Sequence, residues 1–140
     1  MPEPSLHHVG YVVPSIAESL ARWSATLSVV SVSDPFDDEI QRARVVFLQF
    51  ASGGTTLELV EPLPGDSPVL RFLQKGGGLH HLCFEVDDLE EHIRLMKTHQ
   101  ALLLRKPQPA IAFGGRHIAW MVTRDKLLTE YLERPRPQLQ

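Results

Sequence analysis

The sequence is poor in the features that would assign it to several broad classes of protein. Cys83 is the only cysteine among its 140 residues, which excludes an internal disulfide and favours a reducing compartment such as the cytoplasm. No apolar run approaches the roughly 20 residues of a membrane-spanning helix, and the first residues lack the basic and then apolar pattern of a signal peptide. The net charge is −3, so the chain has no basic footprint for nucleic acid or an anionic membrane. We expect one cytoplasmic globular domain over residues 1–140.

An internal repeat is the most informative pattern in the chain. The segment 6–13 (LHHVGYVV) matches the segment 79–86 (LHHLCFEV), which places His8 and His81 at an offset of 73 residues. Both segments are rich in apolar and β-branched residues, and this predicts a strand in each. The repeat indicates that the chain is built from two related structural units.

A helix is predicted after each of these strands. Ser15 with Glu18, and Asp88 with Glu91, have the spacing of a capping residue followed by a carboxylate three positions later. Apolar residues then recur at i, i+4 and i+7, which places them on one face of a helix. They are Ile16, Leu20 and Trp23 in the first half, and Leu89, Ile93 and Met96 in the second. We interpret both faces as part of the core.

Three further strands are predicted in each half. They are 29–32, 44–50 and 55–60, followed in the second half by 101–104, 116–122 and 127–132. The pattern predicts an α+β fold in which two βαβββ modules, about 6–61 and 79–133, form one curved mixed sheet with helices on its convex side. The linker 62–78 is predicted to hold a turn, a short helix over 67–74 and a glycine-rich end. Residues 105–115, rich in proline and glycine, are predicted to be an irregular loop, and a flap over a site is favoured over a plain connector.

Two histidines and two glutamates occupy matching strand positions of the repeat. They are His8 and Glu58 in the first half, and His81 and Glu130 in the second. Because side chains alternate between the two faces of a strand, all four are expected to point away from the helices. A single strand histidine is usually a packed or surface residue, and a single strand glutamate usually faces water. The matched set instead favours metal ligation.

The charges of this set are the reason for expecting a metal ion. If the two halves form one curved sheet, the four side chains are expected to converge on its concave side. Two carboxylates aimed at one enclosed point repel each other unless one of them takes up a proton. A divalent cation with two neutral imidazoles and two carboxylates leaves the site uncharged. Nitrogen and oxygen ligands of this kind suit Co, Zn, Ni, Mn or Fe, so the identity of the ion stays open. No zinc-finger or HExxH spacing is present, and the hypothesis therefore depends on the fold.

The other histidines receive simpler interpretations. His7 and His80 match each other in the repeat and lie on the opposite strand face, which suggests packing or hydrogen bonding. His92 and His99 fall on or after the second helix and are expected to face solvent. A surface position is also favoured for His117.

Some aromatic and basic residues are weaker candidates for the site. Phe47, Trp120 and Val12 are interpreted as cavity walls, with sheet packing as a nearly equal alternative. Five basic residues are weak candidates for binding an anionic substrate, since such residues on loops and strand ends are usually only solvated. They are Arg44, Arg71, Lys75, Arg105 and Arg116.

These motifs resemble the vicinal oxygen chelate (glyoxalase/bleomycin resistance/dioxygenase) superfamily, and within it the methylmalonyl-CoA epimerases. The segment 7–13 (HHVGYVV) is similar to the opening strand motif of that family, and 57–62 (LELVEP) with 66–68 (DSP) is similar to its middle motif. A glycine-rich stretch with a His-His pair at 77–81 (GGLHH) and the segment 128–131 (LTEY) extend the resemblance, which covers about residues 6–133.

The resemblance implies a site and a reaction. It places the metal ligands at His8, Glu58, His81 and Glu130. It implies that the divalent ion stabilises the enolate of a CoA or carrier-protein thioester, that Glu130 or Glu58 acts as the base, and that the chain forms a homodimer. The third-strand glutamate that serves as an acid/base in some epimerases corresponds here to Val45, so the exact reaction stays open.

Three alternative functions remain at this point. A lactoylglutathione-lyase-like isomerase or a dioxygenase would use the same fold, although four protein ligands differ from the two-His-one-carboxylate iron site of many oxygenases. A metal-free antibiotic-binding resistance protein would need none of the four ligands. An enzyme of a biosynthetic pathway that acts on an acyl carrier thioester is the third.

Overall fold

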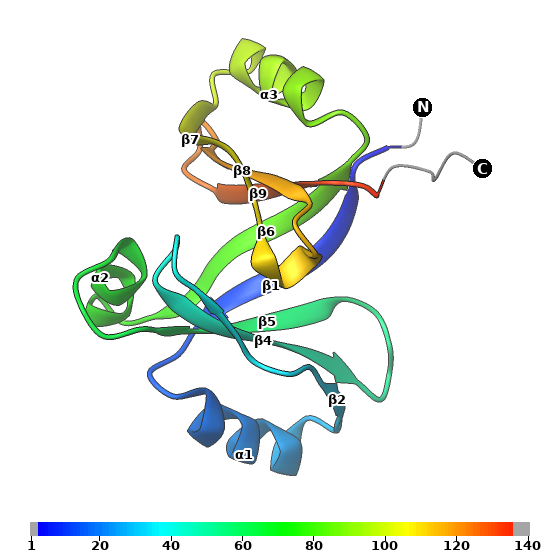
Figure 1. Cartoon of the computed structure of the whole chain (residues 1–140). Helices are drawn as coiled ribbons and strands as arrows, with labels where there is room; N and C mark the ends of the chain where they lie inside the picture. Colours follow the sequence, from blue (N-terminus) through cyan, green and yellow to red (C-terminus); the bar gives the residue numbers. More distant parts are fainter. Residues whose placement is uncertain (1–2, 136–140) are drawn as a thin grey trace. The chain divides into compact units, whose positions relative to one another are not determined.

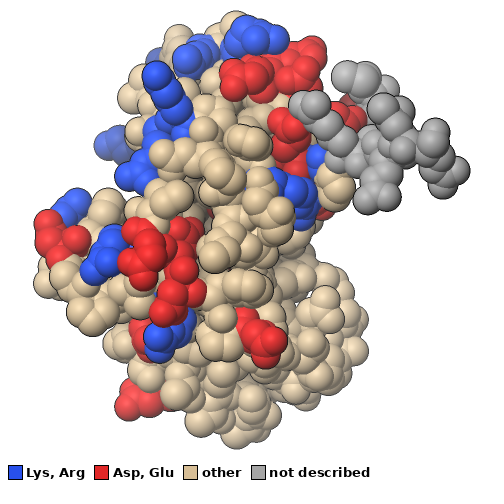
Figure 2. All heavy atoms as spheres, viewed as in Figure 1, with Lys and Arg blue, Asp and Glu red and all other residues tan. Residues whose placement is uncertain are grey.

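The structure is a computed structural model that describes residues 3–135 (Figure 1). The chain divides into two compact units. We call residues 8–80 the first module, and residues 3–7 together with 81–135 the second module. None of the helices within the described residues is long and apolar enough to cross a membrane. Charged side chains of both signs are interspersed on the face shown in Figure 2, as expected for a chain with a small net charge.

The first module contains a five-stranded mixed sheet with α1 against one face. Its elements are β1 Ser5–Val12, α1 Ile16–Thr26, β2 Val29–Val32, β3 Phe36–Asp38, β4 Ala43–Phe50, β5 Thr56–Pro62 and α2 Pro68–Gln74. The strand order is β2-β4-β5-β1, and β3 pairs with β4 beside β2. β1 and β5 run parallel, whereas β4 is antiparallel to its neighbours. A parallel pair needs a long crossover, and the segment from α1 to β4 provides it.

Helix α1 is fixed at its start by two side chains. The hydroxyl of Ser15 accepts a hydrogen bond from the backbone N–H of Glu18 at 3.2 Å, as the capping signal predicted. A carboxylate oxygen of Glu61 on β5 accepts from the N–H of Ile16 at 2.9 Å and so ties the helix to the sheet. The predicted apolar face then packs on Leu48 and Leu59, both fully buried.

The second module repeats this arrangement. Its elements are β6 Gly78–Val86, α3 Leu89–Thr98, β7 Leu102–Pro109, the 3₁₀ turn Ile111–Phe113, β8 His117–Val122 and β9 Leu128–Glu133. The strand order is β6-β9-β8-β7, with β6 and β9 parallel and the other pairs antiparallel. Asp88 caps α3 by accepting from the N–H of Glu91 at 3.0 Å. The predicted stripe of Leu89, Ile93 and Met96 packs against the sheet.

The predicted α+β class with two βαβββ modules is therefore confirmed, and so is the short helix of the linker. The predicted irregular loop over 105–115 is wrong in its first half, because β7 continues to Pro109. β7 is the last strand in the order of the second module and carries two register shifts against β8. An edge strand with bulges accommodates Pro107 and Pro109, since many of its N–H groups need no strand partner.

Strand β3 was not predicted from the sequence. Its residues pair with the start of β4, and Arg44 on β4 donates two hydrogen bonds to the Asp37 carboxylate, at 2.7 and 3.2 Å. The hydrogen bonds from Arg44 lower the pKa of Asp37 and hold it ionised. Two adjacent aspartates are unfavourable for a strand in isolation, and this cross-strand ion pair offsets that preference.

One glycine of the linker has a packing reason to be glycine. Gly77 has φ +67°, and a Cβ there would lie 3.0 Å from the carbonyl oxygen of Val12 and 3.2 Å from Leu73. The backbone after α2 therefore passes β1 more closely than a side chain allows.

Candidate metal centre

The first module places His8 beside Glu58. Glu58 on β5 pairs with Gly10 on β1, and His8 lies two residues before Gly10, so both side chains project from the same face of the sheet. Nε2 of His8 lies 3.6 Å from Oε1 of Glu58. The neighbouring residues Leu57 and Leu59 turn to the other face and pack toward α1, as the alternation predicted.

The second module places His81 beside Glu130 in the same way. Glu130 on β9 pairs with Cys83 on β6, and His81 lies two residues before Cys83. Nε2 of His81 lies 3.4 Å from Oε1 of Glu130. Tyr131 turns to the opposite face and joins the core beneath α3. The histidine and the glutamate therefore occupy equivalent strand positions in the two modules. The 73-residue repeat alone did not establish this equivalence.

The chemistry of these donors fits a divalent cation. Direct N–H···O hydrogen bonds have donor–acceptor distances of about 2.7–3.2 Å, so both pairs are more widely spaced than a normal hydrogen bond. Two donors that each lie about 2.0–2.1 Å from one zinc ion, at a tetrahedral angle, are about 3.3–3.4 Å apart. Imidazole nitrogen and carboxylate oxygen are also ligands that several divalent transition metals accept.

Burial makes the charge of each pair important. His8 is fully buried, and Glu58, His81 and Glu130 are 6%, 4% and 2% exposed. A buried carboxylate requires a compensating positive charge or a proton. Either a protonated imidazole or a bound cation supplies that charge. The structure brings together one imidazole and one carboxylate in each module, and ligation by all four residues stays a prediction.

Comparison with known proteins identifies the family. The model of the Glyoxalase/Bleomycin resistance protein/Dioxygenase superfamily matches residues 7–120. The chain belongs to this superfamily. It is 31% identical over 122 residues to the ethylmalonyl-CoA/methylmalonyl-CoA epimerase of Cereibacter sphaeroides, covering 86% of this chain and 89% of that protein. It is 37% identical over 123 residues to the mitochondrial methylmalonyl-CoA epimerase of Homo sapiens, covering 86% and 67%.

A solved structure shows the same fold. The methylmalonyl-CoA epimerase from Mycobacterium tuberculosis matches with a TM-score of 0.81 and 23% identity, over 98% of this chain and 94% of that one. The family match over residues 7–120 confirms, at the level of the superfamily, the resemblance noted in the motifs. The two relatives at 31% and 37% identity are named as epimerases.

Several other predicted residues of this superfamily member can now be placed. His7 packs edge-on against Phe113, and His80 packs edge-on against Phe72, so the packing interpretation of this pair is confirmed. His99 and His117 are exposed, as predicted. The rings of Phe47 and Trp120 are half-buried and contact the imidazoles of the two His–Glu pairs, a contact that neither of their sequence interpretations included.

His92 differs from its predicted solvent-facing position. It is half-buried against Tyr131, with ring centroids 4.4 Å apart. Burial lowers the pKa of His92 below its usual value of 6.5. The unfolded chain therefore binds a proton at a higher pH than the folded protein does.

This difference predicts a dependence of stability on pH. As the pH falls through about 6.5, the unfolded state takes up the proton first, so the free energy of unfolding decreases. We expect His92→Leu to flatten this decrease between pH 7.5 and 5, measured by urea unfolding. His99→Gln, at the exposed end of the same helix, should keep it. An unchanged slope in the His92 variant would contradict the prediction.

Three of the five candidate basic residues already have carboxylate partners. Arg44 pairs with Asp37 at 2.7 Å. Arg71 pairs with Asp66 at 2.7 Å, and Arg116 pairs with Glu85 at 3.0 Å. An anionic substrate would have to compete with these carboxylates, which weakens the case for all three.

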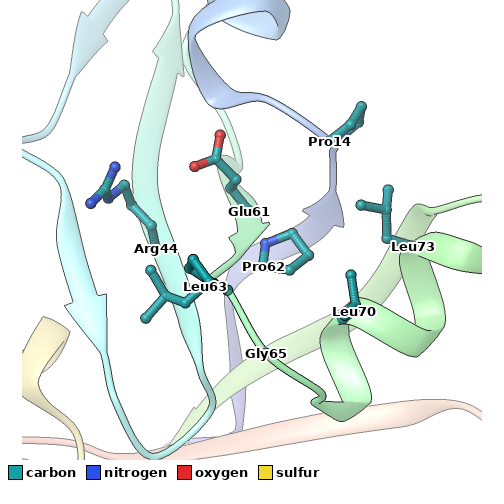
Figure 3. A pocket seen from close by; sticks show the side chains of 9 residues that line it. Pro14, Arg44, Glu61, Pro62, Leu63, Gly65, Leu70 and Leu73 are labelled. Carbon is teal, nitrogen blue, oxygen red and sulfur yellow. The ribbon is translucent and has the colours of Figure 1, made fainter.

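The first module also contains a cavity that the sequence did not predict. Its volume is about 600 Å³, and Figure 3 shows the side chains around it. The lining residues are Pro14, Arg44, Glu61, Pro62, Leu63, Pro64, Gly65, Leu70 and Leu73. Neither His8 nor Glu58 is among them. On β5, the side chains of Glu61 and Glu58 project from opposite faces, because the two residues are three positions apart. This cavity is therefore separate from the first His–Glu pair.

Proposed function

We propose that the chain is a metal-dependent epimerase or isomerase of a CoA-thioester carbon acid, similar to methylmalonyl-CoA epimerase. His8, Glu58, His81 and Glu130 hold the metal in this proposal. The observation that carries it is the same buried His–Glu pair at equivalent register in each module. The relatives named as ethylmalonyl-CoA or methylmalonyl-CoA epimerases support the substrate class.

The bound divalent ion would supply Lewis acidity toward the thioester carbonyl, which makes the neighbouring C–H more acidic. The protein itself must then move protons. Glu130 or Glu58 accepts the proton from the α-carbon, and epimerisation requires a second group that returns a proton to the opposite face. Val45 cannot act there, since its side chain is apolar and buried in β4. In this proposal a glutamate acts as base once it is released from the metal, and the other glutamate or a water molecule is the second group.

Two measurements test this proposal. Elemental analysis of the purified protein should find a divalent transition metal, and methylmalonyl-CoA in D₂O should exchange its α-proton and invert its configuration. Metal without exchange would favour a lactoylglutathione-lyase-like isomerase, a dioxygenase or an enzyme acting on a carrier-bound thioester. Neither metal nor exchange would favour the antibiotic-binding alternative.

We also propose that the chain forms a homodimer in the cytoplasm. Light scattering of the purified protein, which measures its molar mass in solution, tests the dimer.

A further inference from the structure

Each His–Glu pair is accompanied by an aromatic ring at a fixed position. Phe47 on β4 is the direct cross-strand partner of Glu58, and Trp120 on β8 is the direct partner of Glu130. Phe47 and Trp120 are themselves 73 positions apart, the offset of the repeat. We call His8, Phe47 and Glu58 the first trio, and His81, Trp120 and Glu130 the second trio.

In both trios the ring contacts the imidazole almost at right angles. The ring centroids of His8 and Phe47 are 5.3 Å apart at 72°, and those of His81 and Trp120 are 4.7 Å apart at 81°. Perpendicular contact at this distance is a favoured geometry for aromatic pairs, and it restricts rotation of the imidazole about its side-chain bonds. The ring and the carboxylate therefore enclose the imidazole from two neighbouring strands.

The repetition separates these contacts from ordinary packing. His7 and His80 also touch aromatic rings, but their partners do not match each other in the repeat. Phe113 comes from the 3₁₀ turn of the second module, whereas Phe72 comes from α2. In the two trios, by contrast, the imidazole, the ring and the carboxylate all recur at equivalent register.

We infer that Phe47 and Trp120 are positioning residues, which hold the imidazoles of His8 and His81 with Nε2 toward the adjacent carboxylate for metal binding. This inference rests on the proposed metal site. Groups that orient a metal-binding histidine commonly change metal affinity by about 10–100-fold when they are removed. A ring contact is weaker than the hydrogen bonds behind that range, so we expect the lower end.

The test compares variants that remove the ring with variants that keep it. Phe47→Leu and Trp120→Leu should bind Co²⁺ about tenfold more weakly than wild type and change its visible spectrum. Phe47→Tyr and Trp120→Phe, which keep an aromatic ring, should bind Co²⁺ with the wild-type affinity and show the wild-type Co²⁺ spectrum. Phe113→Leu and Phe72→Leu, which remove the rings beside His7 and His80, are matched controls and should leave Co²⁺ binding unchanged. Thermal unfolding of the metal-free proteins reports any loss of stability separately.

The outcomes distinguish the inference from the function on which it rests. If wild type binds Co²⁺ and both leucine variants bind it with the same affinity and spectrum, the positioning role is wrong and the metal site stands. If the wild-type protein binds no divalent metal, the positioning role and the proposed metal site are both wrong. Phe47→Leu changes the first module and Trp120→Leu the second. If one of these variants fails to fold, Co²⁺ binding by the other still tests the positioning role.

Discussion

Replacing His81 with alanine is expected to remove bound metal and turnover together. His81 is 4% exposed, and its Nε2 lies 3.4 Å from the Glu130 carboxylate. A four-ligand zinc site has a binding free energy of about 10–16 kcal/mol, so loss of one ligand should weaken binding about 100-fold or more. Elemental analysis after dialysis and the α-proton exchange assay measure the two effects.

The adjacent histidine provides the control. His80 is half-buried in the first module and packs against Phe72, with ring centroids 4.8 Å apart. His80→Ala should lose this packing contact but keep the metal and the exchange activity. Full metal content and normal turnover in His81→Ala would overturn the assignment of the ligands.

Replacing either glutamate with glutamine should strongly slow inversion of the substrate but leave part of the proton exchange. Glutamine keeps a carbonyl oxygen as a metal ligand, but it cannot accept a proton from carbon. If Glu58 and Glu130 serve opposite faces, each variant still exchanges the proton of one epimer and fails with the other. We expect inversion to fall by about 10²–10⁴-fold in each variant, the usual contribution of a general acid or base.

NMR with the two separate epimers in D₂O distinguishes these cases, with metal content measured in parallel. Glu85→Gln is a matched control, because Glu85 is also a strand glutamate, on β6, but its carboxylate pairs with Arg116 at 3.0 Å. It should invert substrate at nearly the wild-type rate. Wild-type inversion in both Glu58→Gln and Glu130→Gln would exclude them as the acid/base pair.

The parts of the structure that the sequence predicted are governed by local signals. Ser15 and Asp88 cap their helices through contacts only three residues away, and the apolar stripes follow from helical spacing. For the two His–Glu pairs, local signals predicted the strand face of each side chain but not the register that brings the two residues of a pair together. Strand alternation set the face of each side chain, and the repeat indicated which strands carried equivalent residues.

The features that the sequence missed depend on contacts between distant residues. The last residues of β7 contain two prolines, and only their place at a sheet edge makes a strand possible. His92 carries no sequence signal of burial, because its partner Tyr131 lies on β9. The contacts of Phe47 and Trp120 with the imidazoles required the register of three strands, which the repeat suggested but could not measure.

The second module is assembled from two stretches of chain, and this affects the order in which the protein can fold during synthesis. Arg134 donates hydrogen bonds to the carbonyl of Glu3 at 2.6 Å, to the hydroxyl of Ser5 at 3.0 Å and to Asp87 at 2.8 Å. Residues 8–80 leave the ribosome as one continuous stretch and can fold first, since domains form as units from the N-terminus onward. The hydrogen bonds of Glu3 and Ser5 with Arg134 can form only after residue 134 has been made. Glu3 and Ser5, at the start of the described chain, are therefore among the last residues to complete their contacts.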